Sequence, residues 1–183
     1  MRKIIFVDPQ KCLACKTCEL ACAVAHSKSK DLEQAINEFP LPEKRVFVEQ
    51  IPELPYALYP VPYTLPLQCR HCEDAPCVKI CPTKALEKSN DEPVLIKNEL
   101  CIGCKWCILV CPFGVIKLNR EGKVIIKCDL CIDRLKDGKE PACVSACPTK
   151  ALKYKSVEEI TAVTRKEAIK KYLVELVVEK DQM

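Results

Sequence analysis

The chain has 183 residues, and 16 of them are cysteine, a proportion typical of disulfide scaffolds and metal proteins. Without the cysteines, hydrophobic residues make up only roughly 40 % of the chain, so ordinary side chains supply a thin core. The composition argues against disorder and low complexity, because only four residues are glycine and no block of like charges occurs. The formal charge of +4 is only a weak hint of acidic partners.

The start of the chain does not have the pattern of a secretory leader. Its apolar run, residues 4–7, ends at Asp8, whereas a leader needs roughly 7–15 apolar residues. No stretch approaches the roughly 18 apolar residues of a membrane span. We therefore expect a cytoplasmic protein without a direct membrane span. In that reducing compartment, clustered cysteines are metal ligands more often than disulfides.

The cysteines fall into four groups of four. Groups one and three share the spacing C-x2-C-x2-C-x3-C, whereas the middle gap is four residues in group two and eleven in group four. Three groups end in Cys-Pro, at Pro82, Pro112 and Pro148, and group one has Ala23 instead. In chain order the groups are Cys12, Cys15, Cys18 and Cys22; Cys69, Cys72, Cys77 and Cys81; Cys101, Cys104, Cys107 and Cys111; and Cys128, Cys131, Cys143 and Cys147.

This spacing is typical of bacterial ferredoxins and has a geometric reason. The first three cysteines lie on a tight loop around one cubane, and the fourth follows by one helical turn and points to the neighbouring cluster. The proline after it lacks an N–H and turns the chain away. Sixteen thiolates at four per cluster predict four [4Fe–4S] clusters, with all sixteen cysteines as iron ligands.

Other uses of the cysteines fit less well. Zinc sites would gain nothing from a third cysteine or from Cys-Pro, and the expected compartment disfavours disulfides. No cysteine stands apart from the groups as a catalytic thiol, and none is missing to leave an open iron.

Part of the sequence repeats internally. Residues 81–86 and 147–152 both read Cys-Pro-Thr-Lys-Ala-Leu, and residues 111–118 have the same outline. Strand-like segments precede the cysteine groups, for example at residues 94–96 and 124–126. The repeated unit predicts an α+β, ferredoxin-like fold. Spacing alone allows group two to pair with group three, or group three with group four.

On these four motifs, residues 3–153 resemble the four-cluster iron–sulfur subunits of molybdopterin oxidoreductases, formate dehydrogenases and hydrogenases. The resemblance implies two bacterial-ferredoxin-like dicluster units, one inserted into the other, with a C-terminal helix. It implies an outer unit of residues 1–38 and 120–155, a proline-rich connector of residues 39–66, an inserted unit of residues 67–119 and a helix in residues 156–183.

The same resemblance implies four ligand sets, here named A to D, whose clusters would lie in a line as an electron-carrying wire. Set A is Cys12, Cys15, Cys18 and Cys147; set B is Cys22, Cys128, Cys131 and Cys143; set C is Cys81, Cys101, Cys104 and Cys107; set D is Cys69, Cys72, Cys77 and Cys111.

A narrower resemblance concerns residues 7–28 and the short total length, which are most similar to the electron-transfer subunit of nickel carbon monoxide dehydrogenase systems. It implies carbon monoxide dehydrogenase as the catalytic partner. The downstream acceptor would be an NAD(P)-reducing flavoprotein or a hydrogenase. The alternatives are a subunit of a formate dehydrogenase, hydrogenase or aldehyde oxidoreductase complex, and a free-standing polyferredoxin shuttle.

Two regions contain no cysteine ligands. Residues 39–66 contain seven of the 14 prolines, which indicates an extended connector or a stiff docking surface, with a strand considered for residues 45–51. Residues 156–180 predict a helix, because Ser156 and Glu159 fit a capping box and apolar residues recur on one face. That face either packs over a ferredoxin unit or docks a partner subunit.

Two histidines lie close to cysteines. His71, between Cys69 and Cys72, either donates a hydrogen bond toward cluster sulfur or shapes its loop, whereas His26 has the pattern of a plain histidine on a helix surface.

The sequence contains no feature of substrate chemistry. Phosphate-binding loops, paired carboxylates and nucleophile triads are missing, as are the aromatic and basic patches of nucleic-acid binding. We predict a non-catalytic electron-transfer subunit without a nucleic-acid partner. Each oxidised cluster with its thiolates carries about −2, so the formal +4 becomes about −4, and the basic residues balance the clusters.

Overall fold

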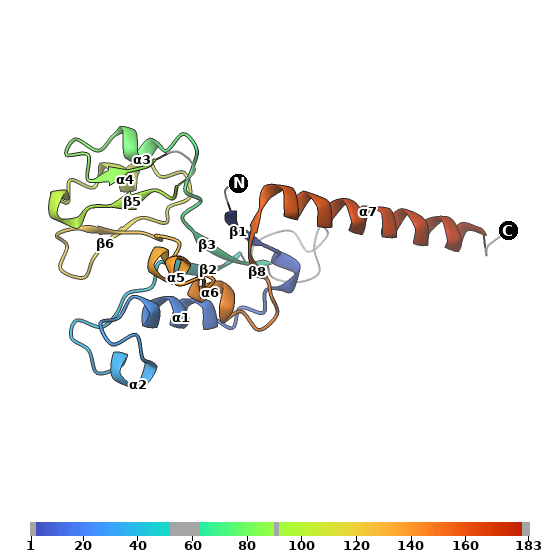
Figure 1. The fold of residues 1–183 in the computed structure, drawn as a ribbon, viewed down its shortest axis with the longest axis horizontal. Coiled ribbons are helices and arrows are strands. Elements are labelled where there is room, and N and C mark those ends of the chain that lie inside the picture. The colour runs from blue at the N-terminus through green and yellow to red at the C-terminus, as the bar shows by residue number, and fades with distance from the viewer. Residues whose placement is uncertain (1–2, 52–62, 90–91, 181–183) are drawn as a thin grey trace.

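A computed structural model describes residues 3–51, 63–89 and 92–180. Its strands form four separate two-stranded antiparallel sheets: β1 (Lys3–Val7) with β8 (Leu152–Ser156), β2 (Val46–Ile51) with β3 (Tyr63–Gln68), β4 (Leu86–Glu87) with β5 (Leu95–Ile96), and β6 (Lys117–Leu118) with β7 (Ile125–Ile126). The α-helices are α1 (Thr17–Ala25), α2 (Leu32–Ala35), α3 (Pro76–Lys79), α4 (Trp106–Leu109), α5 (Ile132–Lys136), α6 (Ala142–Ser145) and α7 (Val157–Lys180). Short 3-10 turns occupy Pro9–Lys11 and Asn98–Leu100. This mixture agrees with the predicted α+β class (Figure 1).

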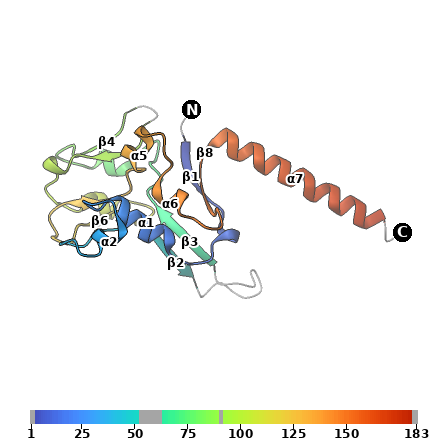
Figure 2. The same cartoon turned by 60° about the horizontal axis from the view of Figure 1, so that its bottom comes forward.

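The N-terminal strand pairs with a strand from the far end of the chain. In the β1–β8 ladder, Lys3 lies opposite Ser156 and Val7 lies opposite Leu152, and Figure 2 shows the two strands side by side. Ile5 and Val7 alternate with more exposed neighbours, as expected for a strand with one buried face. The ladder therefore brings cysteine groups one and four into the same part of the molecule.

The buried hydrophobic residues form two separate clusters. The first core draws on two distant stretches of the chain, roughly the first fifty residues and residues 130–152. Four cysteines belong to it, and they come from groups one and four. Its buried members are Ile5, Val7, Cys18, Cys22, Val46, Val48, Leu130, Cys143, Val144, Cys147, Ala151 and Leu152.

The second core lies within residues 75–125 and is smaller. The short β4–β5 and β6–β7 ladders frame it, and α3 and α4 pack against each other beside them, on the left of Figure 1. Its buried members are Ala75, Cys77, Leu86, Val94, Cys107, Ile116 and Ile125. These two cysteines belong to groups two and three, so the second core joins the two middle groups.

The proline-rich region contains a β-hairpin arm. The strand considered for residues 45–51 is present as β2, and it pairs with β3 from Val46 opposite Gln68 to Ile51 opposite Tyr63. Val46 and Val48 are buried in the first core, so this part of the predicted connector is a structural element of that core. The middle of the region, residues 52–62, lies outside the described residues.

Two acidic side chains fix this region to its neighbours. Glu19 of α1 accepts a hydrogen bond from Val48 N at 2.7 Å and pairs with Lys44 at 2.6 Å. Glu43 accepts hydrogen bonds from Lys117 Nζ and Arg120 N, both at 2.9 Å. Burial alone would raise the pKa of Glu43, but these donors outweigh it and lower the pKa. Glu43 thus ties the start of the hairpin to β6 beside the second core.

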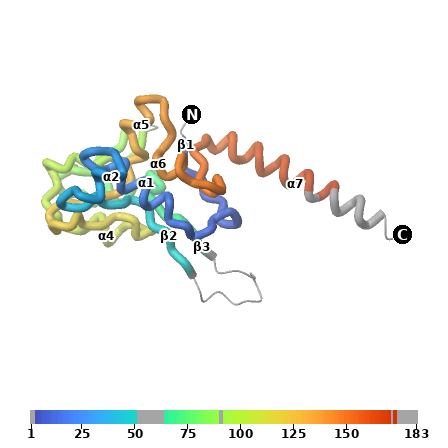
Figure 3. The backbone as a smooth tube through the Cα atoms, turned by 90° about the horizontal axis from the view of Figure 1, so that it is seen from below, coloured from blue at the N-terminus to red at the C-terminus, as the bar shows by residue number. Residues whose placement is uncertain are grey.

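The C-terminal helix is confirmed, together with its capping box. Ser156 N donates to Glu159 Oε2 at 2.7 Å, and Glu159 N donates to Ser156 Oγ at 3.2 Å. The helix contacts β8 and β1, and the part drawn in colour extends from there away from the two cores (Figures 1 and 3). Ile169, Tyr172 and Leu173 are 57–69 % exposed. Among the side chains of α7 that the structure describes, packing over a ferredoxin unit, one of the two roles expected for this face, is therefore limited to the start of the helix.

Removing iron from the protein is expected to abolish cooperative folding. Six of the nineteen buried core residues are cysteines, and without iron their thiols lose the bonds that hold both cores together. Thermal scans by far-UV circular dichroism should show no cooperative transition in iron-free protein, and reconstitution with iron and sulfide should restore one. A cooperative melt of the iron-free chain would contradict the prediction.

Candidate functional site

All sixteen cysteines are free thiols. Most are buried or half-buried, and only Cys15 and Cys104 are exposed. Burial raises the pKa of Cys18, Cys77, Cys107 and Cys131 to about 11 in each case. In the iron-free chain these thiols therefore hold their protons at neutral pH, and metal binding must displace them.

Each CxxC loop turns through the left-handed backbone region at the same position. The residue directly before the second cysteine has a positive φ in all four groups: Ala14 (58°), His71 (48°), Gly103 (66°) and Leu130 (59°). At Gly103 a Cβ atom would lie only 2.4 Å from the backbone oxygen of Lys123, so only glycine fits there. The shared turn directs successive cysteine side chains toward a common point.

The three Cys-Pro segments also share one turn. The third residue after the cysteine has a positive φ at Lys84, Gly114 and Lys150. Its N–H donates to the cysteine carbonyl at 3.2–3.3 Å in all three. The internal repeat seen in the sequence is thus a repeat of backbone geometry, and group one, which lacks the proline, continues in α1 instead.

Two of the four expected ligand sets line cavities of their own. One cavity is lined by Cys12, Cys15, Cys18 and Cys147, the members of set A. Another is lined by Cys81, Cys101, Cys104 and Cys107, the members of set C. In each cavity the chain brings together three cysteines of one group and the fourth cysteine of another.

Among the remaining eight cysteines, burial and neighbouring thiols raise the pKa of Cys143 and of Cys77. Burial and then the neighbouring thiols of Cys128, Cys22 and Cys131 raise the pKa of Cys143 well above its ordinary value, and these are the four members of set B. Burial is also the first cause at Cys77, where Cys69, Cys111 and Cys72 add to the rise in pKa, and these are the members of set D.

Cysteines of neighbouring sets also influence one another electrostatically. Cys18 of set A contributes to the raised pKa of Cys143 in set B, after burial and the thiols of set B. Cys77 of set D likewise contributes to the raised pKa of Cys107 in set C, after burial and Cys104. The sets are therefore close in the pairs A–B and C–D, which match the first and second cores.

Several thiols accept hydrogen bonds from the protein. Arg45 N donates to Cys22 Sγ at 3.2 Å, while His71 N and Leu130 N donate to Cys69 and Cys128 at 3.4 Å. Such donors favour the charged thiolate and raise the potential of a cluster bound to it. For His71 and Leu130 the position follows from their left-handed backbone, which directs the N–H back at the first cysteine of the loop, whereas Arg45 reaches Cys22 from the segment before β2.

His26 is not the plain surface histidine that the sequence predicts. Its Nε2 lies 3.0 Å from Asp129 Oδ1 and its Nδ1 lies 2.7 Å from the Cys22 carbonyl oxygen, so both ring nitrogens donate and the ring is an imidazolium. Burial alone would lower the pKa of His26, but the hydrogen bonds to Asp129 and Cys22 raise it to about 9. Arg45 completes the network by pairing with Asp129. Sequence reasoning missed it because Asp129 lies more than eighty residues along the chain from both His26 and Arg45.

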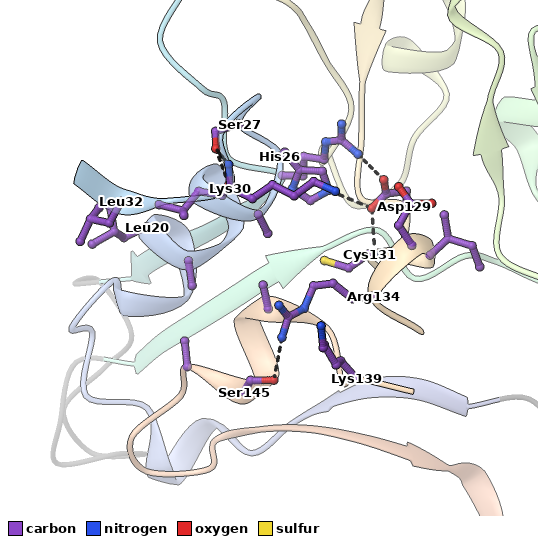
Figure 4. A pocket seen from close by; sticks show the side chains of 18 of the residues that line it. Leu20, His26, Ser27, Lys30, Leu32, Asp129, Cys131, Arg134, Lys139 and Ser145 are labelled. Atoms are coloured by element: carbon purple, nitrogen blue, oxygen red, sulfur yellow. Dashed lines mark hydrogen bonds and ion pairs between the residues drawn. The ribbon is translucent and has the colours of Figure 1, made fainter. Parts of the chain in front are cut away.

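A surface cleft of about 890 Å³ opens beside this network, between α1, α5 and α6. Figure 4 shows His26, Asp129 and Cys131 on one side of the cleft, with Arg134 and Lys139 on the other. Ligand atoms of His26, Asp129 and Cys131 lie within 4.8 Å of one another. However, both ring nitrogens of His26 already donate, so His26 has no free lone pair for a metal ion and the trio does not offer three ligands to a separate metal.

The donor sets fit [4Fe–4S] clusters. Cubane clusters use four thiolates each. Sixteen free thiols suffice for four such clusters, and eight of them line two common cavities, four to each. A zinc site would need no fourth cysteine from a distant group. Two bound cubanes per core would replace the side-chain volume that the sequence lacks.

Comparisons with known proteins agree with this donor set. A model of the 4Fe-4S dicluster domain matches residues 61–157, and a second 4Fe-4S dicluster model matches residues 11–86. The chain is 36 % identical over 155 residues to a subunit of the anaerobic dimethyl sulfoxide reductase of Escherichia coli (strain K12), covering 85 % of this chain and 74 % of that subunit. It is 42 % identical over 164 residues to an iron-sulfur protein of Rhodospirillum rubrum (82 % and 80 % covered), and 37 % identical over 158 residues to the thiosulfate reductase electron transfer subunit of Salmonella typhi (85 % and 77 % covered).

Fold and site thus define an iron–sulfur protein of the ferredoxin class, whose sixteen cysteines fit four [4Fe–4S] clusters. The chain belongs to the family of 4Fe-4S dicluster proteins that serve as electron-transfer chains of reductases. It is a non-catalytic subunit, as predicted. No helix in the described part of the chain is both long enough and apolar enough to cross a membrane.

Replacing Asp129 by asparagine is expected to destabilise the iron-loaded protein by about 2 kcal/mol, because two charge-assisted hydrogen bonds are lost and the His26 and Arg45 cations face each other without a counter-charge. The measurement is the urea midpoint of unfolding of the iron-loaded chain.

The matched control is Asp137→Asn, because Asp137 is 66 % exposed and pairs loosely with Lys139 at 3.7 Å. This variant should leave the midpoint nearly unchanged. Equal midpoints for the two variants would show that the Asp129 network contributes no stability.

Proposed function

We propose that this chain carries electrons through four [4Fe–4S] clusters, between a catalytic oxidoreductase subunit and a downstream acceptor. The observation that supports the proposal is that cysteines from different groups line two common cavities, four to each, while the remaining thiols contribute to the raised pKa of Cys143 and of Cys77. Electron transfer of this kind needs no substrate site, only cluster spacing, tuned potentials and contact with two partners.

In the proposed ligand scheme, each of sets A to D holds one cluster. Set A is supported by the cavity that its four cysteines line, and set C by the equivalent cavity in the second core. Sets B and D are supported by the mutual electrostatic effects of their thiols. In every set the fourth ligand comes from a different group than the other three. This is expected because the fourth cysteine of a group follows the third by one helical turn and points to the neighbouring cluster.

The proposed order of the wire is A, B, D, C. Sets A and B share the first core and sets D and C share the second. Cys15 of set A and Cys104 of set C are the two exposed cysteines, which supports the two ends of the wire at these sets. An exposed apolar residue follows the first cysteine of each end group, Leu13 at 69 % and Ile102 at 67 %, and both suit contact with a protein partner.

We further propose that the unit of groups two and three is inserted into the unit of groups one and four. The boundaries are those expected from the sequence, residues 1–38 and 120–155 for the outer unit and 67–119 for the inserted one. The β1–β8 ladder and the two separate cores support this division. The β2–β3 hairpin is then part of the outer unit, because β2 contributes to the first core.

For the catalytic partner, the proposal is a nickel carbon monoxide dehydrogenase, with an NAD(P)-reducing flavoprotein or a hydrogenase as the acceptor. Its support is the resemblance of residues 7–28. A second candidate is a reductase of the dimethyl sulfoxide or thiosulfate type, which the names of two relatives favour. We place the protein in the cytoplasm, because sixteen free thiols suit a reducing compartment.

Serine variants test the ligand scheme. The native chain should contain about 16 iron and 16 sulfide. Cys15→Ser and Cys147→Ser should change the EPR signal of the same cluster, although 131 residues separate them in the chain. Cys143→Ser, only four positions from Cys147, should change a different cluster. The scheme is wrong if the Cys143 and Cys147 variants alter one shared signal.

Purification from the native host tests the partner. The chain should elute with a large subunit that contains nickel, measured by elemental analysis of the complex. Molybdenum in the large subunit instead would select the second candidate. A lone particle of about 20.7 kDa would favour the free-standing shuttle over both.

A further inference from the structure

Lys127 is a buried lysine at the joint between the two cores. Its side chain is 2 % exposed and is the largest of the fully buried side chains, although lysine is almost never buried without a charged partner. It directly follows β7 of the second core and directly precedes Cys128 of set B. A cation in this position is costly unless negative charge lies nearby.

The Lys127 ammonium has two neutral hydrogen-bond partners. Its Nζ donates to the backbone oxygen of Val94 at 2.5 Å and to that of Cys128 at 2.6 Å. Among the residues that the structure describes, no carboxylate forms an ion pair with it. Thiolates of the neighbouring cysteine sets can supply the compensating negative charge.

Thiols of two different sets lie within the electrostatic reach of Lys127. Burial raises the pKa of three thiols here, and the positive charge of Lys127 opposes the rise in each. The three are Cys69 and Cys77 of set D and Cys128 of set B. At Cys18 and Cys107, in the two outer sets, the main causes of the raised pKa are burial and their own neighbours.

Hydrogen bonds join Lys127 to the loop of set D. Val94, whose carbonyl accepts from Lys127, donates its own N–H to His71 Nδ1 at 3.0 Å. The backbone N–H of His71 in turn donates to Cys69 Sγ at 3.4 Å. Val94 and His71 are 1 % and 2 % exposed. Buried hydrogen bonds thus connect the Cys128 loop of the first core to the Cys69 loop of the second.

We propose that Lys127 is a fixed cation shared by the two inner clusters, and that it raises the reduction potentials of both together. The inference rests on the ligand sets of the proposed function. One electron passed from a neighbouring cluster adds one negative charge to the site that receives it. A buried ammonium beside both inner sites stabilises this reduced state in either one. Lys127 thereby keeps sets B and D close in potential across the joint, where the wire passes from one core to the other.

The test compares three substitutions in the full-length, iron-loaded protein. Lys127→Met removes the charge and the hydrogen bonds, Lys127→Gln keeps donors without the charge, and Lys127→Arg keeps both. The matched control is Lys136→Met, because Lys136 is 71 % exposed. Iron and sulfide contents are measured first, and EPR-monitored redox titration then gives the midpoint potential of each cluster.

The methionine and glutamine variants should lower the midpoint potentials of the two inner clusters and leave the other two unchanged. The expected decrease is about 59 mV for each one-electron couple, which corresponds to a tenfold smaller equilibrium constant for reduction. The arginine variant and the Lys136 control should keep all four near their native values. Four unchanged midpoints in a fully loaded neutral variant would overturn the proposal, and so would an equal shift of all four.

Defective loading is also informative. If only the methionine variant loses iron, the glutamine and arginine variants still isolate the effect of charge. Loss of iron from both neutral variants, with arginine fully loaded, supports the requirement for a cation. Loss of iron from all three variants contradicts the proposal, because loading would then depend on the shape of the lysine side chain and not on its charge. The serine variants of Cys15, Cys143 and Cys147 keep Lys127 intact, so an error in the ligand sets is detected separately.

Discussion

The structure depends on one constraint, that sixteen thiols must meet in fours inside a chain with little other material for a core. The same cysteines serve as ligands and as core residues, since Cys18, Cys22, Cys143 and Cys147 belong to the first core. Burial raises the pKa of most of the buried thiols, Cys143 among them, so the folded arrangement is unfavourable for thiolates until iron replaces their protons. We therefore expect folding and cluster binding to be one process in this protein.

The two cores are joined by few but specific polar contacts. Glu43 links the hairpin segment to β6 and to Arg120 N, while Lys127 links Val94 to the start of group four. Both contacts are charge-assisted, and such bonds hold a more defined geometry than apolar packing between small units. In the proposed wire, fixed geometry at this joint would set the spacing between the inner cysteine sets, on which the electronic contact between the two halves depends.

Particular residues show how far sequence reasoning reaches. The helix of residues 156–180 was predictable because its capping box and periodicity are local. The network of His26, Arg45 and Asp129 was not, because no local pattern reports that three distant side chains meet. The burial of Lys127 was not predictable for the same reason, because a lysine next to a cysteine ligand in the sequence is expected to be a surface residue. The exposure of the apolar face of α7 was equally undetermined, because periodicity identifies a face without saying what covers it.

The number of thiols, their grouping, the [4Fe–4S] chemistry and the ferredoxin-type repeat were all predictable from the sequence, because ligand spacing and turn geometry are encoded within a few residues. The folded chain then selected which distant groups lie together. It did so through the β1–β8 ladder and the two cores, since spacing alone allowed more than one pairing of the groups. It also decided where charge is buried, because desolvation depends on neighbours from every part of the chain and not on the residues on either side.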